Sequence, residues 1–234
     1  MLGIDIQSAG YESKTVIRRL SFQLNQPTLL VVIGHNGSGK TTLFRCIASS
    51  IAFQGSVTWN NNPIHYGNQP VAYLPQRNTL HFPISVLELI RLAIDPEKNR
   101  WFGYTPIENK QAAALASAFG LGDKLMDDMN QLSGGQQQLA WMAQLAARQA
   151  SVWVLDEPTQ SLDLHHKHLI AKNLEQQVHE NKRIVIFSTH DIDLLEGFEG
   201  LLINLSEMEP KLEKISVQSI ERAKSFLKQA PLKK

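Results

Sequence analysis

The sequence has almost no cysteine and no excess of charge of either sign. Cys46 is the single cysteine among 234 residues, which excludes an internal disulfide and is typical of a reducing compartment. We expect Cys46 to be a small buried residue rather than a reactive thiol. The chain carries 23 Lys and Arg against 22 Asp and Glu. A general nucleic-acid binder usually shows a concentrated basic excess, so this balance argues against that class of protein.

Long hydrophobic runs are also lacking. The longest apolar stretch, residues 28–33, is the size of a strand and falls well short of the roughly 18 residues that a membrane span needs. Residues 1–6 lack the positive region and apolar core of a secretory signal. We therefore expect a chain that does not cross a membrane by itself. If it works at a membrane, another subunit must supply the span.

Short β-rich runs alternate with helical ones, which is typical of an α/β fold with a parallel sheet. Strands are expected at 2–7, 15–24, 28–33, 55–59, 71–74, 152–155, 184–187 and 201–205. Helices are expected at 40–49, 107–119, after Ser133, and at 164–180 and 217–227. The section from 77 to 150 contains Pro-bounded turns and helical runs. We interpret it as a helical subdomain inserted into a single domain whose core comprises about 1–76 and 151–234.

A glycine-rich loop follows the apolar stretch 28–33. Residues 34–41 fit the pattern G-x-x-x-x-G-K-[ST], which cradles phosphates when it joins a strand to a helix. The glycines let backbone N–H groups approach phosphate oxygens. Lys40 would reach the β- and γ-phosphates, and the Thr41 hydroxyl would ligate Mg²⁺. The residues expected to bind nucleotide here are Gly34, Asn36, Gly37, Ser38, Gly39, Lys40, Thr41 and Thr42.

Acidic and polar residues follow three other expected strands. Asp156 comes after the apolar run 152–155, at the sheet edge where open α/β sheets bind ligands, and would hold Mg²⁺. Glu157 would polarise the attacking water. Gln76, after the strand 71–74, is a candidate for bringing an amide oxygen to Mg²⁺ or its water. His190 would donate to the γ-phosphate. Glu157, His190 and Lys40 form the expected catalytic set.

The stretch 131–136, Gln-Leu-Ser-Gly-Gly-Gln, indicates an ATPase that closes its nucleotide between two subunits. Ser133 is expected to be a helix N-cap followed by two permissive glycines, and such a helix N-terminus can receive a γ-phosphate. Ser133, Gly135 and Gln136 are therefore expected to bind nucleotide. They would do so from a second subunit, since Ser133 and Lys40 are not expected to reach the same phosphate within one chain. Asp163, with Ser161, is a candidate connection between the two sites of a dimer.

An aromatic residue and a histidine cluster are the remaining candidates. Tyr11, on an expected turn between strands, would stack on adenine. His165, His166 and His168 share a polar helix, and two of them stand at i and i+3. We interpret them as a solvated face rather than a zinc site.

The order and spacing of these motifs resemble the nucleotide-binding subunit of ABC transporters over essentially the whole chain. The resemblance implies a P-loop NTPase core of RecA-like type, with an N-terminal antiparallel β region and a helical subdomain. It also implies ATP and Mg²⁺ as cofactors and a head-to-tail homodimer, in which Ser133 and Gly135 of one subunit close over ATP held by Lys40 of the other. No catalytic position is missing, so we expect an active ATPase.

Two positions depart from the family pattern. His35 stands where the family often has Pro. Leu139 stands where a basic residue is common, which we expect to alter the helix surface and not the phosphate contacts.

Two stretches resemble importers within this family. Residues 74–86 are similar to the Q-loop region of zinc or manganese importers, and 139–146 with 155–159 and 162–166 are similar to ATPases of iron-siderophore and cobalamin importers. The resemblance implies permease subunits and a solute-binding protein as partners, no nucleic acid, and a peripheral position on the cytoplasmic face of the inner membrane. The choice between metal ion and metal chelate stays open.

Other classes fit the sequence less well. A soluble ABC ATPase acting on ribosomes or nucleic acid is the main alternative, and an exporter subunit is another. Translation-factor types carry two ATPase units and DNA-repair types a long coiled coil, whereas this sequence shows one unit and no coiled coil. A lone P-loop kinase or GTPase has no use for the Ser133 to Gly135 motif.

Overall fold

The computed structural model describes residues 1–12, 14–65, 70–78, 80, 82–94, 103–160 and 162–228. The chain divides into two compact units. The core unit comprises Met1–Gln76, Ser151–Gln160 and Leu174–Lys234, and the helical unit comprises Arg77–Ala150 and Ser161–Asn173.

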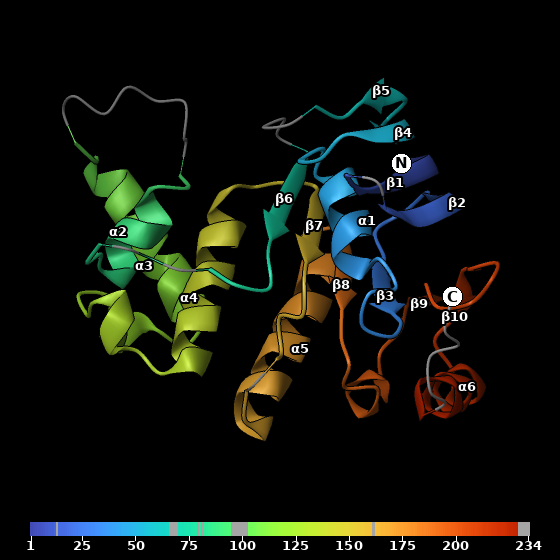
Figure 1. Ribbon diagram of the computed structural model, residues 1–234. Coiled ribbons are helices and arrows are strands. Elements are labelled where there is room, and N and C mark those ends of the chain that lie inside the picture. Colours follow the sequence, from blue (N-terminus) through green and yellow to red (C-terminus); the bar gives the residue numbers. More distant parts are fainter. Residues whose placement is uncertain are drawn as a thin grey trace. The chain divides into compact units, whose positions relative to one another are not determined.

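A four-stranded antiparallel sheet forms the N-terminal part of the core unit (Figure 1). Its strands are β1 (Leu2–Tyr11), β2 (Lys14–Leu24), β4 (Phe53–Trp59) and β5 (Asn62–Pro63), in the spatial order β2-β1-β4-β5. Leu2, Ile4 and Ile6 are buried while Asp5 and Gln7 are exposed. This period of two is what a strand with one face against a core requires.

A six-stranded sheet forms the rest of the core unit, in the order β10-β9-β3-β8-β7-β6. Five of its strands run parallel, and β10 is antiparallel to β9. The five residues of β3 and of β8 are all buried, as parallel strands covered on both faces should be. The strands are β3 (Leu29–Ile33), β6 (Val71–Leu74), β7 (Val152–Leu155), β8 (Ile184–Ser188), β9 (Leu201–Asn204) and β10 (Glu213–Lys214).

Helix α1 (Lys40–Ile47) connects the two sheets through its packing. It contacts β1, β2 and β4 of the antiparallel sheet and β7 of the six-stranded sheet. Leu43, Phe44 and Ile47 of α1 are fully buried in one apolar cluster with strand residues of both sheets. The core unit also contains η3 (Asp193–Leu195), α6 (Val217–Lys228) and the end of α5 (Leu164–His179).

The helical unit contains three helices that pack on one another: α2 (Val86–Arg91), α3 (Pro106–Ala118) and α4 (Gly134–Ala147). Each begins with a capping box, formed by Ser85 with Glu88, Thr105 with Glu108, and Ser133 with Gln136. A capping box satisfies two N–H groups that a helix start leaves without partners. Two short 3₁₀ turns, η1 (Gly122–Lys124) and η2 (Met129–Gln131), join α3 to α4.

Most of the expected elements are confirmed to within a few residues. The helix α2 and the two-residue strands β5 and β10 were missed, because each is too short to show a period. Tyr11 is the last residue of β1 and not part of the turn. Leu139 is buried rather than on the helix surface. The domain bounds given above stay a proposal, and the helical unit also includes Ser161–Asn173.

Within the described part of the chain, each helix is too short or too polar to span a lipid bilayer.

The thiol of Cys46 should be inert in the folded protein. Cys46 is buried in α1, and burial raises the pKa of its thiol to about 12. Relative to an exposed cysteine, this leaves about a thousandfold less thiolate at neutral pH, and the thiolate is the reactive form. We predict that Ellman's reagent labels the native protein very slowly and labels one thiol per chain on unfolding. Rapid stoichiometric labelling of the native protein would show that Cys46 is accessible.

Candidate functional site

The phosphate loop joins β3 to α1 and depends on glycine for its backbone. Gly37 and Gly39 have φ angles of 81° and 106°, in the left-handed region that other residues rarely adopt. Gly39 precedes α1, and a Cβ there would lie 3.0 Å from Cγ1 of Ile17. The loop therefore presents backbone rather than side chains at the start of α1, which is the arrangement that cradles phosphates. Asn36 and Gly37 are exposed, and Thr42 is buried.

Lys40 and Ser38 present buried polar groups within this loop. Lys40 is only 7 % exposed, and its Nζ donates to the carbonyl oxygens of Gly34 at 2.9 Å and His35 at 3.5 Å. Burial lowers the pKa of Lys40, and the carboxylates of Glu157 and Asp156 act in the opposite direction. The Ser38 hydroxyl is buried and, among the described residues, has no hydrogen-bond partner. Phosphate oxygens would give the Ser38 hydroxyl the partner that it lacks and would give Lys40 a charged acceptor, so these residues fit a nucleoside triphosphate.

Asp156 and Thr41 bring oxygen atoms together at the carboxyl end of β7. Asp156 is 2 % exposed; its Oδ2 accepts from the Thr41 hydroxyl at 2.6 Å and its Oδ1 from the Ser188 hydroxyl at 2.8 Å. Hard oxygen ligands of this kind suit Mg²⁺. The described residues contain no group of three or more His, Cys, Asp or Glu side chains that could hold a metal. Thr41 and Asp156 are the residues here that would hold Mg²⁺, with the nucleotide and water completing its shell.

Glu157 is held at its backbone and at both carboxylate oxygens. Its φ of 52° is strained for this residue type, and its N–H donates to the Ser188 hydroxyl at 2.9 Å. Its Oε1 lies 2.7 Å from Nε2 of His190, and its Oε2 accepts from the Gln76 amide at 3.3 Å. The same amide donates to Gln160 at 2.8 Å. A carboxylate fixed in this way is suited to orient a water molecule.

Tyr11 contacts α1, and His35 lies within the phosphate loop. The Tyr11 hydroxyl accepts from Arg45 of α1 at 3.1 Å, and the Arg45 guanidinium lies 5.8 Å from the Tyr11 ring centre. Stacking of Tyr11 on adenine stays a prediction. The His35 ring lies 5.7 Å from that of Phe226 on α6, and the His35 N–H donates to Ser206 at 2.8 Å. The loop that follows β3 is thus supported by the C-terminal part of the core unit.

Ser133, Gly135 and Gln136 of the helical unit lie at the start of α4, and Asp163 lies at the start of α5. Ser133 is confirmed as the N-cap: its hydroxyl accepts from the Gln136 N–H at 3.3 Å, and the Gln136 side chain accepts from the Ser133 N–H at 3.0 Å. Asp163 accepts from the backbone N–H and from Nδ1 of His166, both at 2.8 Å, and so caps α5. Ser161 lies outside the described residues. The nucleotide contacts of Ser133, Gly135, Gln136 and Asp163 stay predictions.

Sequence reasoning missed several residues that hold the site. Ser188 bonds to both carboxylate residues, and its position at the end of an apolar strand two residues before His190 was the available signal. Gln160 and Arg45 are partners of predicted residues and gave no signal of their own. His166 was expected on a solvated face, but its side chain is only 21 % exposed because it bonds to Asp163. His165 and His168 are exposed, as expected.

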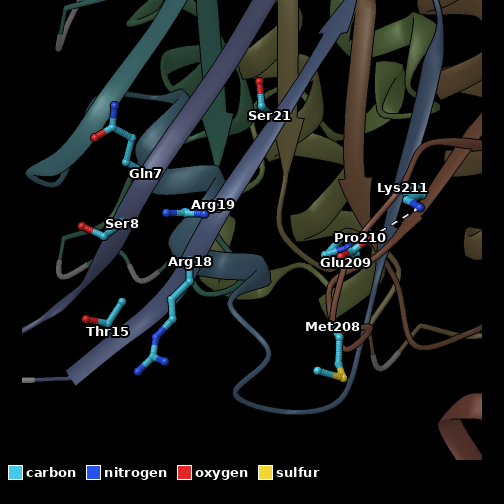
Figure 2. Close-up of a pocket in the computed structure, with 10 residues that line it drawn as sticks. All are labelled: Gln7, Ser8, Thr15, Arg18, Arg19, Ser21, Met208, Glu209, Pro210 and Lys211. Atoms are coloured by element: carbon cyan, nitrogen blue, oxygen red, sulfur yellow. Dashed lines mark ion pairs between the residues drawn. The ribbon is translucent and has the colours of Figure 1, made fainter.

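A cavity of about 810 Å³ lies elsewhere in the core unit (Figure 2). Its lining includes Gln7 of β1, Arg18 and Arg19 of β2, and Met208 and Lys211 of the β9–β10 loop. None of the predicted site residues lines it. The sheet edge that holds the phosphate loop, and not this cavity, is therefore the candidate site.

Comparison with known proteins identifies the class to which this fold and site belong. The family model described as ABC transporter matches residues 17–160. The manganese transport system ATP-binding protein of Listeria innocua is 27 % identical over 209 residues, covering 84 % of this chain and 83 % of that protein. The achromobactin transport ATP-binding protein of Dickeya dadantii is 32 % identical over 194 residues, covering 79 % and 71 %.

Solved structures show the same fold. A nucleotide-free ATP-binding cassette from an ABC transporter matches with a TM-score of 0.81 at 18 % identity, covering 96 % of this chain and 94 % of that one. A dimeric ATP-binding cassette in a post-hydrolysis state, bound to ADP and Pi, matches with a TM-score of 0.78 at 21 % identity, covering 92 % and 99 %. The predicted P-loop NTPase fold is thus confirmed. The chain belongs to the ABC transporter family and is an ATPase of that family.

Replacement of Glu157 should separate binding from hydrolysis. We predict that Glu157→Gln still binds MgATP but hydrolyses it about 100- to 10,000-fold more slowly, because an amide cannot polarise water as a carboxylate does. The measurement is phosphate release by the purified protein, with MgATP binding followed separately. The matched control is Glu199→Gln, which makes the same charge change at an exposed position of the core unit. Hydrolysis by Glu157→Gln at the unsubstituted rate would contradict the role of Glu157.

Proposed function

We propose that this ATPase hydrolyses MgATP within a head-to-tail homodimer and energises an importer of a metal ion or metal chelate. The observation that carries the hydrolytic part is the Glu157 carboxylate, held between His190 at 2.7 Å and Gln76 at 3.3 Å. It lies one residue after Asp156, whose oxygens are bonded to Thr41 and Ser188. The metal part rests on the resemblance of residues 74–86 and on relatives that serve manganese and achromobactin transport.

Each site residue of the core unit has a distinct role in the proposed hydrolysis of ATP. The backbone N–H groups of the phosphate loop and Lys40 bind the β- and γ-phosphates, and Tyr11 binds adenine. Thr41 and Asp156 hold Mg²⁺ with Gln76 at its water, and the ion supplies charge neutralisation on the phosphates. Glu157 orients the attacking water. In this structure His190 donates its Nε2 proton to Glu157, since a carboxylate only accepts, and it would give this hydrogen bond to the γ-phosphate instead when nucleotide is bound.

The position of Ser133 at an exposed helix start supports the proposed dimer. Ser133 and Gly134 are exposed at the N-terminus of α4, with the remaining N–H groups of the first turn available for an anion. Lys40 belongs to the core unit and Ser133 to the helical unit. A structural relative described above is a dimer with ADP and Pi bound, which supports the same assembly for this chain.

A bulky cation at Ser133 should prevent this assembly. In the Glu157→Gln background, MgATP is expected to convert the protein to a dimer on a sizing column. We predict that Ser133→Arg abolishes the dimer, because the side chain fills the space that the phosphate would occupy.

The control for this test is Ala114→Arg, which adds the same side chain at an exposed position of α3 in the same unit. It should leave the dimer intact. If Ser133→Arg remained an ATP-dependent dimer, the start of α4 would not be the closing surface.

As an importer subunit, this chain would have permease subunits and a solute-binding protein as partners. It would lie at the periphery of the membrane, on the cytoplasmic face. The helical unit exposes apolar side chains suited to a permease: Phe82, Leu92, Ile107 and Met126. Phe82 is 56 % exposed and follows the Gln76 segment, so it is the strongest candidate. Ile84 and Val86, which follow Phe82 in the sequence, are buried in the helical unit and do not serve this contact.

Copurification from native membranes tests the importer assignment. We predict that the tagged chain recovers a polytopic membrane protein and that Phe82→Asp lowers this recovery about tenfold or more, as loss of a central apolar contact does. The ATPase activity of the purified variant should be unchanged, since Phe82 is not part of the nucleotide site. Met208→Asp, at a 96 % exposed apolar residue of the core unit, is the control.

Recovery of ribosomes or DNA without any membrane protein would overturn this assignment. That outcome would favour the soluble ABC ATPase as the function. The ATP-binding chemistry of the core unit would stand in either case.

A further inference from the structure

His166 joins two motifs that lie apart in the sequence. Its Nδ1 lies 2.8 and 2.9 Å from the two carboxylate oxygens of Asp163. Because a carboxylate only accepts hydrogen bonds, Nδ1 carries the proton and donates it. The same ring lies against Gly135, the third residue of the stretch 133–136, where an added Cβ would meet Cγ, Cδ2 and Nδ1 of His166. One imidazole therefore contacts both Asp163 and the start of α4.

The ring explains why position 135 is glycine. A Cβ on Gly135 would lie 2.8 Å from both Cγ and Cδ2 of His166, closer than real side chains approach. Neither Gly134 nor Gly135 has a positive φ, and a Cβ on Gly134 would meet nothing within 4 Å. The requirement at 135 is thus one of space, and His166 occupies that space. Gly134 carries no such requirement.

The division of the chain agrees with this contact. Ser161–Asn173 belongs to the same compact unit as α4, although the strand before it and the rest of α5 belong to the core unit. Leu169, one turn further along α5, lies 3.8 Å from the position of a Cβ on Gly120. The start of α5 therefore packs on the helical unit at more than one point.

A simpler role for Asp163 leaves the histidine ring unexplained. Asp163 caps α5 by accepting from the His166 backbone N–H, and any residue at 166 would supply that bond. The ring nitrogen adds two further contacts, and the ring face adds the contact with Gly135. His168 on the same helix is exposed and takes part in neither contact.

We propose that His166 is a positioning residue that fixes the Asp163 loop to the Ser133–Gln136 start of α4. The two motifs then move as one body when the nucleotide sandwich closes. In the dimer of the proposed function, on which this inference rests, both motifs face the partner's nucleotide. His166 thus makes the response of one motif depend on the other.

Two substitutions separate the two contacts of the ring. His166→Asn keeps a donor, because its amide nitrogen is as many bonds from the backbone as Nδ1, but it vacates the space beside Gly135. His166→Phe keeps a ring beside Gly135 but removes the donor to Asp163. His168→Phe is the matched control on the same helix.

The first experiment measures the melting temperature of the isolated subunit. Gly135→Ala should lower the Tm by on the order of 2–10 °C because the added methyl overpacks against the ring. In the His166→Asn background the same change should leave the Tm unchanged or raise it, since alanine favours helix. An equal loss in both backgrounds would overturn the proposal, because the ring would not then be what fills the space.

The second experiment measures the MgATP concentration that drives dimer formation in the Glu157→Gln background. His166→Phe and His166→Asn should each raise this midpoint by about 2- to 30-fold, the usual range for residues that couple two sites, because each variant keeps only one of the two contacts that join the motifs. MgATP binding by the monomer should not change. Equal midpoints for His166→Phe, His168→Phe and the unsubstituted protein would overturn the proposal. If the unsubstituted protein formed no dimer, the sandwich itself would fail, and the melting experiment would still decide the contact.

Discussion

The parallel pairing of β6, β7 and β8 is the constraint on which the rest of the site depends. Leu74 pairs with Leu155, and Leu155 pairs with Phe187, so these three strands end at one level. The residues that follow them then meet at one edge of the sheet: Gln76, Asp156 with Glu157, and Ser188 with His190. The pairing of Val32 with Ser188 brings the phosphate loop to the same edge. A shift of one residue in the pairing of a strand would turn its side chains to the other face of the sheet. The register of these buried strands therefore determines which polar side chains meet at this edge.

Hydrogen bonds among the polar residues fix the orientation of the side chains that the sheet brings to this edge. Ser188 is the centre of this arrangement, since its hydroxyl donates to Asp156 and accepts from the Glu157 N–H. The bond to the Glu157 backbone helps to maintain a strained φ at that residue. Glu157 then meets His190 and Gln76 with its two oxygens. These contacts hold the carboxylate in one orientation, as the proposed role of Glu157 in orienting a water molecule requires.

Motifs with a strict spacing were predictable from the sequence, and contacts between motifs were not. The loop at 34–41 and the cap at Ser133 are local features whose residue types are dictated by backbone geometry, so both could be located. The strands β3 and β8 could be located from their continuous apolar runs, which are typical of strands covered on both faces. The six-residue α2 has less than two turns and could not show a helical period, although its Ser85 and Glu88 capping box was a usable signal. Ser188, Gln160 and His166 act through long-range contacts that depend on the register of the sheet and the packing of α4.

The most direct test of the account is a double-mutant cycle between Glu157 and His190 in ATP hydrolysis. The account holds that His190 fixes the Glu157 carboxylate, so the two residues act as one unit. The measured quantity is kcat for Glu157→Gln, His190→Ala and the double variant at saturating MgATP. If the account is right, the double variant is about as slow as the slower single variant, because effects within a catalytic unit are not additive. Multiplication of the two single losses would show that the residues act independently and would contradict the account.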